Sequence, residues 1–172
     1  MIQNPVQHSK KSTSTAGYTL VEVLMFMGLF SMFLVLLTNM FATILETQQR
    51  SLATSYVEQT GRFVLARLMY DVHRATSITT PAAAGSTDTS LDLNIDGVPY
   101  SYSIDNGVFQ LSNSSGVHDL HAGQVTVSNF SLTRIGNVNG KHTLQLSFDV
   151  ESVVPDTTGI QSRTFSTTLG IR

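Results

Sequence analysis

The longest uncharged stretch of the chain constrains its fold more than any other feature. Residues 23–45, "VLMFMGLFSMFLVLLTNMFATIL", contain no Asp, Glu, Lys or Arg. As an α-helix this segment would be about 35 Å long, which exceeds the roughly 30 Å hydrocarbon core of a bilayer. A cleaved secretory signal would have a shorter apolar core, followed by a small-x-small cleavage site, and neither is present. The sequence therefore predicts a membrane-spanning helix.

The charges ahead of this helix predict its orientation. The leader "MIQNPVQHSKKSTSTAG" carries Lys10 and Lys11, and positively charged segments remain on the cytoplasmic side. We therefore expect a single-pass protein of the inner or cytoplasmic membrane, with a cytoplasmic N-terminus and an extracytoplasmic C-terminal part.

Composition excludes several classes of function. The 172-residue chain has no cysteine, so a disulfide framework, a thiolate metal site and a thiol nucleophile are excluded. Residues 76–172 carry eight acidic and only four basic residues, whereas nucleic-acid binding requires clustered Lys and Arg. We expect no direct nucleic-acid partner.

The helical pattern continues beyond the apolar segment. Residues 46–75 contain no proline, and two apolar stripes run along them at helical spacing. The first stripe consists of Leu45, Leu52, Tyr56, Phe63 and Tyr70, and the second of Val57, Val64, Leu68 and Val72. We interpret 18–45 as a transmembrane and assembly helix and 46–75 as its amphipathic, water-exposed stem. Gly61 is a weak point in this stem, and Phe63 and Leu68 are expected to be buried against the rest of the protein.

The remainder of the chain has β character. Residues 76–90 are small and polar and predict a connector, and 91–172 predict a β-rich globular head. Asp96-Gly97 and Asn106-Gly107 are typical of hairpin turns between three short strands. Three further strands follow, the first two joined by "GNVNGK". The predicted fold class is α+β: a long N-terminal helix packed on a small antiparallel β-sheet head.

The segment around the start of the apolar helix resembles a known family. A basic leader that ends in Gly17, followed by "YTLVEVL" and a long apolar helix, resembles the class III signal of type IV pilins and type II secretion pseudopilins. The resemblance implies that a prepilin peptidase cleaves between Gly17 and Tyr18 and methylates the new N-terminus at Tyr18. Family members usually have Phe where this chain has Tyr18.

A looser resemblance extends over the stem and the C-terminus. The segments "VEQTGRFVLARLMYDVHRA" and "RTFSTTLGIR" are similar to minor pseudopilins of the J type and to minor pilins of the PilW and ComGF kind. The resemblance implies a pilin-like fold and a structural subunit of a filament at the cell surface, in the periplasm or in the wall. Its implied partners are prepilin peptidase, other pilin or pseudopilin subunits, the membrane and an inner-membrane assembly platform.

Glu22 is a charged residue at the start of the apolar helix, and a charge at this place requires an explanation. A carboxylate costs roughly 2.5–3.5 kcal/mol at the centre of a membrane helix and less toward its ends. The resemblance implies an assembly and register role, in which Glu22 of one subunit meets the Tyr18 amine of its neighbour, because both charges lack a partner within their own chain. The alternative interpretation is an ordinary interfacial glutamate.

No other motif predicts chemistry. Known catalytic and phosphate-binding patterns are absent, so we expect no catalytic residue, no enzyme activity and no cofactor. His118 to His121, "HDLH", is interpreted as a polar loop and not as a metal site, because a metal needs three or four ligands. Small residues in the apolar helix, Gly28 and Ser31, allow close helix contact or have no role beyond packing. The alternative function is a single-pass membrane-anchored extracytoplasmic β-rich binding module.

Overall fold

The computed structural model of the chain describes residues 17–136, 143–154 and 159–170. The predicted leader before Gly17 and residues 137–141 of the predicted turn "GNVNGK" lie outside the described residues. The chain divides into two compact units, Met1–Thr43 and Ile44–Arg172. The two units are described separately below.

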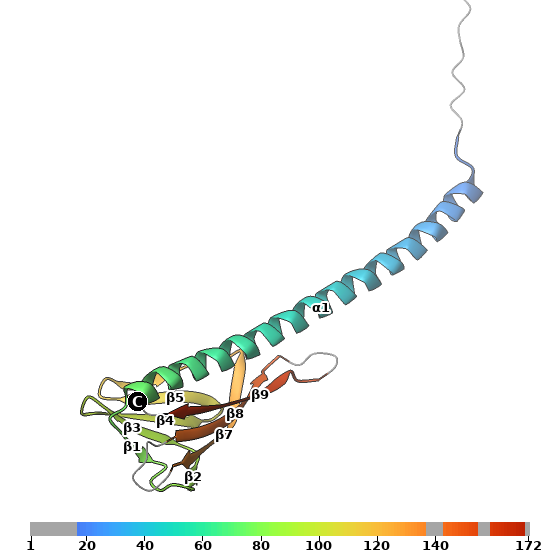
Figure 1. Cartoon of the computed structure of the whole chain (residues 1–172). Coiled ribbons are helices and arrows are strands. Elements are labelled where there is room, and N and C mark those ends of the chain that lie inside the picture. Colours follow the sequence, from blue (N-terminus) through green and yellow to red (C-terminus); the bar gives the residue numbers. More distant parts are fainter. Residues whose placement is uncertain (1–16, 137–142, 155–158, 171–172) are drawn as a thin grey trace, which may run out of the picture. The chain divides into compact units, whose positions relative to one another are not determined.

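A single helix, α1 (Leu20–Arg74), contributes to both units (Figure 1). Its residues 20–43 form an apolar segment that is long enough to cross a membrane, compatible with a single-pass anchor. Hydroxyl groups within this segment are satisfied by the helix itself: Ser31 Oγ donates to Met27 O at 2.7 Å and Thr38 Oγ1 to Leu34 O at 2.9 Å. These side chains therefore require no water in apolar surroundings.

The second unit combines residues 44–74 of α1 with two antiparallel sheets, of five and four strands in the described part of the chain. The five-stranded sheet has the order β1-β3-β4-β5-β6, and the four-stranded sheet has the order β2-β7-β8-β9. The strands are β1 (Ser77–Thr80), β2 (Thr87–Asp88), β3 (Leu91–Ile95), β4 (Val98–Asp105), β5 (Val108–Asn113), β6 (Gly116–Asp119), β7 (Val125–Ile135), β8 (Thr143–Ser152) and β9 (Ser162–Gly170). The predicted α+β class is confirmed, although the head contains two sheets where one was expected.

The two predicted hairpin turns are confirmed. Asp96 and Gly97 have φ angles of 52° and 82°, and Asn106 and Gly107 have φ angles of 48° and 80°. Asn, Asp and Gly tolerate positive φ, and two successive positive φ angles give the tight turn that matches the twist of the strands. The turns fix the register of β3 on β4 and of β4 on β5.

The segment 76–90, expected as a connector, carries β1 and β2. Arg134 of β7 explains how so polar a segment is held. Its buried guanidinium donates from Nη1 to the carbonyl oxygens of Pro81 and Ala82, both at 2.9 Å. Backbone pairing and Arg134 stabilise the segment. Neither of these interactions produces hydrophobic periodicity in the sequence.

The core of the second unit is formed by both sheets and by one face of the stem. A chain of aromatic contacts joins Tyr102 of β4, Phe109 of β5, Phe148 of β8 and Phe165 of β9. The stem contributes the second predicted stripe, Val57, Val64, Leu68 and Val72, all of which are buried. Figure 1 shows the strands beside the green end of α1, which contains these residues.

One prediction about the stem is wrong. Leu68 is fully buried as expected, but Phe63 is 51% exposed and faces away from the core. Phe63 belongs to the first stripe, whose members are all exposed in the isolated chain. The smaller Val and Leu side chains pack against the sheets, and the aromatic stripe is left outside.

Candidate functional site

The predicted cleavage site lies immediately before α1. Gly17 and Tyr18 precede the helix, which begins at Leu20. A Cβ placed on Gly17 would meet no atom within 4 Å, and Tyr18 is 82% exposed. The peptide bond between them is therefore outside regular structure and open to an enzyme in the isolated chain.

Glu22 lies in the first turn of α1, where the helix itself favours a negative charge. Thr19 caps the helix: its Oγ1 accepts a hydrogen bond from the Glu22 N–H at 3.3 Å, and its carbonyl accepts from the Val23 N–H. Thr19 and Glu22 therefore have the spacing of a capping box, and the positive end of the helix dipole lies at the carboxylate. The helix dipole therefore favours the negative charge of Glu22, whereas the cap binds its backbone N–H; that the carboxylate lacks a partner in its own chain stays a prediction. The T-x-x-E pattern in the sequence was the signal for this cap.

Tyr18 and Glu22 contribute to one surface. Together with Val23 and Phe26 they line a hollow of about 320 Å³. This arrangement places the Tyr18 backbone nitrogen, which cleavage would free, on the same end of α1 as the carboxylate. The predicted methylation site, Tyr18, and the predicted register residue, Glu22, thus line the same hollow.

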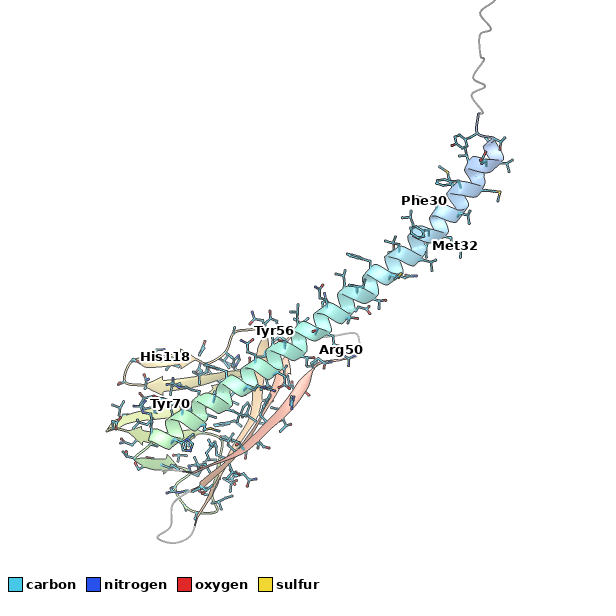
Figure 2. The ribbon with its side chains drawn as sticks, turned by 45° about the horizontal axis from the view of Figure 1, so that its top comes forward. Phe30, Met32, Arg50, Tyr56, Tyr70 and His118 are labelled. Carbon is cyan, nitrogen blue, oxygen red and sulfur yellow. The ribbon has the colours of Figure 1, made fainter. Side chains whose placement is uncertain are left out.

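The first stripe forms an exposed apolar face on the stem. Leu45, Leu52, Tyr56, Phe63 and Tyr70 are each at least 41% exposed. Their spacings of seven and four residues place them on one side of a helix with 3.6 residues per turn, beside the buried stripe. Tyr56 and Tyr70 lie on the segment of α1 that the strands accompany (Figure 2). We call this surface the outer stem face.

A groove runs beside the outer stem face. Side chains of α1 line one wall, and a loop of residues 120–124 after β6 lines the other; the volume is about 280 Å³. The α1 wall consists of Tyr56, Gln59, Thr60 and Phe63, and the loop contributes Leu120, His121, Ala122 and Gln124. A partner that binds the outer stem face would therefore contact the 120–124 loop of the head as well as α1.

The opposite side of the stem is fixed to the last strand. Glu58 pairs with Arg163 of β9, and also with Arg62 one turn later at 3.3 Å. Gly61 is buried, and a Cβ at this position would lie 2.1 Å from the Phe165 ring. The weak point expected at Gly61 is instead a point of close contact between the helix and β9.

A buried carboxylate was missed by the sequence interpretation. Asp71 lies on the stem outside both apolar stripes, and it is fully buried. Its Oδ2 accepts from Arg67 Nε at 2.7 Å and from the Tyr102 hydroxyl of β4. Burial, followed by the hydrogen bond to Asp71, raises the pKa of Tyr102 well above its usual value, so the hydroxyl remains a donor.

The arrangement explains why Asp71 was missed. Arg67 and Asp71 have the i,i+4 spacing of a common surface pair, and the contact that identifies the buried role comes from a strand 31 residues later. Among the described residues, none is a hydrogen-bond partner of the other carboxylate oxygen of Asp71, Oδ1. This network joins the stem to the five-stranded sheet.

The described ranges contain no candidate metal centre. They contain no group of three His, Cys, Asp or Glu residues that could hold a metal ion. His118 and Asp119 lie in β6, a strand where a loop was expected, and His118 Nε2 lies 2.9 Å from Ser115 Oγ. His121 lies in the loop that follows, and its ring is bonded to the backbone.

Comparisons of the chain with protein-family models, with curated proteins and with solved structures each gave no match.

Proposed function

We propose that this chain is a minor pilin or pseudopilin: a structural subunit that is cleaved and methylated by prepilin peptidase and assembled into, or at the tip of, a type IV pilus or type II secretion-like filament. The observation that carries the proposal is the outer stem face. A helix that already buries one apolar stripe against its own head has a second apolar stripe exposed, on the same helix as the apolar segment 20–43. Exposed apolar faces of this kind support interaction with another surface.

The apolar segment supports the same proposal. Every described residue from Gly17 to Thr43 is exposed in the isolated chain, so this segment obtains no packing from its own unit. In the membrane it is covered by lipid, and in a filament it is covered by the helices of neighbouring subunits. The transfer from lipid to protein requires no exposure of the segment to water.

Glu22 and Tyr18 then determine which arrangement of subunits is allowed. Cleavage after Gly17 leaves a positive amine on Tyr18, beside a hollow that Glu22 also lines. Within a bundle of apolar helices, a carboxylate and an amine from neighbouring chains stabilise the arrangement that pairs them. A shifted arrangement buries both charges without partners and costs several kcal/mol.

The proposed location follows from the same events. The N-terminus begins in the cytoplasm, the head is extracytoplasmic, and the subunit remains a single-pass membrane protein until an assembly platform extracts it. The partners are prepilin peptidase, that platform, the membrane and other pilin or pseudopilin subunits. The end point is a filament at the cell surface, in the periplasm or in the wall.

The first test is the N-terminus of the mature protein, read by mass spectrometry of the membrane fraction. We expect a chain that begins with N-methyl-Tyr18, and loss of this species in Gly17→Arg, because a peptidase site that faces glycine has no room for a long charged side chain. Gly17→Ala is the matched control and should still be cleaved. A mature chain that retains its leader would instead support the membrane-anchored binding module.

The second test separates cleavage from assembly. Glu22→Gln keeps the shape of the side chain but removes its charge, so membrane insertion and cleavage should continue while co-purification with filaments or assembly partners falls. Cleaved Glu22→Gln protein recovered in filaments at the wild-type level would show that Glu22 acts only as part of the helix cap. Thr19→Ala is the control for the cap, because it removes the capping hydroxyl and leaves the carboxylate.

A further inference from the structure

The ring of His121 attaches the middle of the 120–124 loop to the head, and the Gln124 carbonyl at the end of the loop accepts a hydrogen bond from the Val153 N–H at 3.0 Å. His121 Nε2 accepts a hydrogen bond from the backbone N–H of Phe109 in β5 at 3.0 Å, and His121 Nδ1 lies 3.0 Å from the carbonyl oxygen of Ala122. The adjacent Leu120 N–H donates to the Phe109 carbonyl at 2.9 Å. Phe109 is fully buried among the core aromatic rings, so the loop is hydrogen-bonded to the buried core of the head.

The chemistry of these contacts requires a neutral imidazole. The tautomer with its proton on Nδ1 satisfies both contacts, because Nδ1–H donates to Ala122 and the lone pair of Nε2 accepts from Phe109. Protonation places a second hydrogen on Nε2, opposite the Phe109 N–H. Two donors then face each other, and the bond between the loop and β5 is lost.

We propose that His121 is a pH-sensitive latch: the 120–124 loop forms the second wall of the groove on the outer stem face only while His121 is neutral, and acidification opens this wall and weakens docking of a neighbouring subunit's helix. The docking part rests on the proposed function, whereas the latch is a property of the single chain. The groove supplies the connection, because its two walls are the α1 residues Tyr56 and Phe63 and the loop that His121 holds.

Ionisable groups lie on the elements around His121. β5 presents the Phe109 backbone to it, and β7 begins with the buried Val125. Tyr56 of α1 lines the groove together with His121. β6 carries His118, whose Nε2 lies 2.9 Å from Ser115 Oγ, and Asp119. Arg134 of β7 donates to the carbonyl oxygens of Pro81 and Ala82. Asp119 Oδ1 already accepts from Gln110 Nε2 at 3.0 Å. The occupant is a helix because the groove extends along α1 and is continuous with the outer stem face.

The latch is tested on the full chain in detergent micelles by amide hydrogen exchange. Protection of the Phe109 and Leu120 amides, corrected for intrinsic exchange, is compared at about pH 7.5 and about pH 5.5, which bracket the usual titration of histidine. We expect protection to fall about tenfold or more at the lower pH, because each amide exchanges through local opening of the loop. The Leu93 amide in β3 is an internal reference and should not change.

Two variants assign the effect to His121. In His121→Gln the side-chain oxygen accepts from Phe109 at either pH, so protection should become independent of pH. His118→Gln is the matched control, because His118 is exposed and bonded to Ser115, and it should retain the wild-type pH dependence. Equal protection at both pH values in the wild type, or pH dependence that persists in His121→Gln, would overturn the latch.

The docking part is read separately, as co-purification of the chain with filaments or assembly partners at the same two pH values. We expect recovery to fall severalfold at the lower pH in the wild type and to remain unchanged in His121→Gln. Equal recovery of the wild type at both pH values would overturn the role of the loop in docking. A chain that never co-purifies would refute the proposed function, while the exchange experiment would still decide the latch.

Discussion

Gly61 shows how a single residue determines the distance between the stem and the head. A helix interior disfavours glycine by about 1 kcal/mol relative to alanine, and this cost made Gly61 a weak point in the sequence interpretation. In the structure the ring of Phe165 occupies the space that a Cβ would take. The loss in helix propensity is offset by burial of an aromatic ring, which is 8% exposed.

The contact between Gly61 and the Phe165 ring leaves no room for a side chain at position 61. Gly61→Ala should destabilise the second unit by about 1–3 kcal/mol, because the new methyl group forces the ring or the helix to move. The measurement is denaturant unfolding of the full chain in detergent, monitored by the far-UV circular dichroism signal of β-structure. Gly28→Ala is the control, since a Cβ at Gly28 meets nothing within 4 Å. Unchanged stability in Gly61→Ala would mean that Phe165 is not held against the stem.

At the level of elements, the stem has two apolar faces, and the sequence could not determine which one is covered. Both stripes have helical spacing, so periodicity predicts both equally well. Phe63 of the first stripe and Leu68 of the second were both expected to be buried, and only Leu68 is. The observed choice has a physical reason: Val57, Gly61 and Val64 are small, so the helix can approach the sheets closely, and the aromatic rings of the head fill the space beneath.

Two substitutions, one on each face of the stem, distinguish the buried face from the outer stem face. Leu68→Ala should cost about 2–5 kcal/mol of unfolding free energy, because it leaves a cavity in a fully buried position. Phe63→Ala should cost about 1 kcal/mol or less, as for a surface position, but should reduce recovery with partner subunits. Thermal unfolding and co-purification of both variants provide the measurements. A larger loss of stability in Phe63→Ala than in Leu68→Ala would reverse this assignment of the faces.

The strands were predictable to different degrees for identifiable reasons. β3, β4 and β5 alternate apolar and polar residues between Asp-Gly and Asn-Gly turns, so both pattern and turn chemistry indicate them. β1, β2 and β6 are short and polar, and β6 is fully exposed. Their partners are backbone groups and the guanidinium of Arg134, which leave no periodic signal in the sequence.

At the level of the whole molecule, the division at Thr43 and Ile44 predicts that the head and stem fold without the apolar segment. A chain that begins at Glu46 should be soluble and unfold cooperatively, with the same midpoint as the head of the full chain in detergent. It should also self-associate with increasing concentration through the outer stem face, which analytical ultracentrifugation would detect. Replacing Tyr56 and Phe63 with Ser is the control and should keep the chain monomeric. Failure of the shorter chain to fold would show that the first unit is required.

The candidate site was predictable where its residues are close in the sequence. Gly17, Tyr18 and Glu22 lie within six positions, so a short motif is sufficient to identify them, and the hollow beside Tyr18 and Glu22 is consistent with their grouping. A short sequence motif could not identify the roles of Asp71 and His121. Tyr102 meets Asp71 across 31 residues, and Phe109 meets His121 through a backbone amide, which carries no side-chain identity that a sequence pattern could register.

The contact between β9 and the stem also has a consequence for the order in which the molecule matures. A ribosome produces the stem before β9, so Glu58 and Gly61 lack their counterparts until Arg163 and Phe165 have been synthesised. Until then the side of the stem that β9 covers is exposed, as the outer stem face is. The nascent stem therefore exposes two sides, and pairing of β9 with β8 closes one of them.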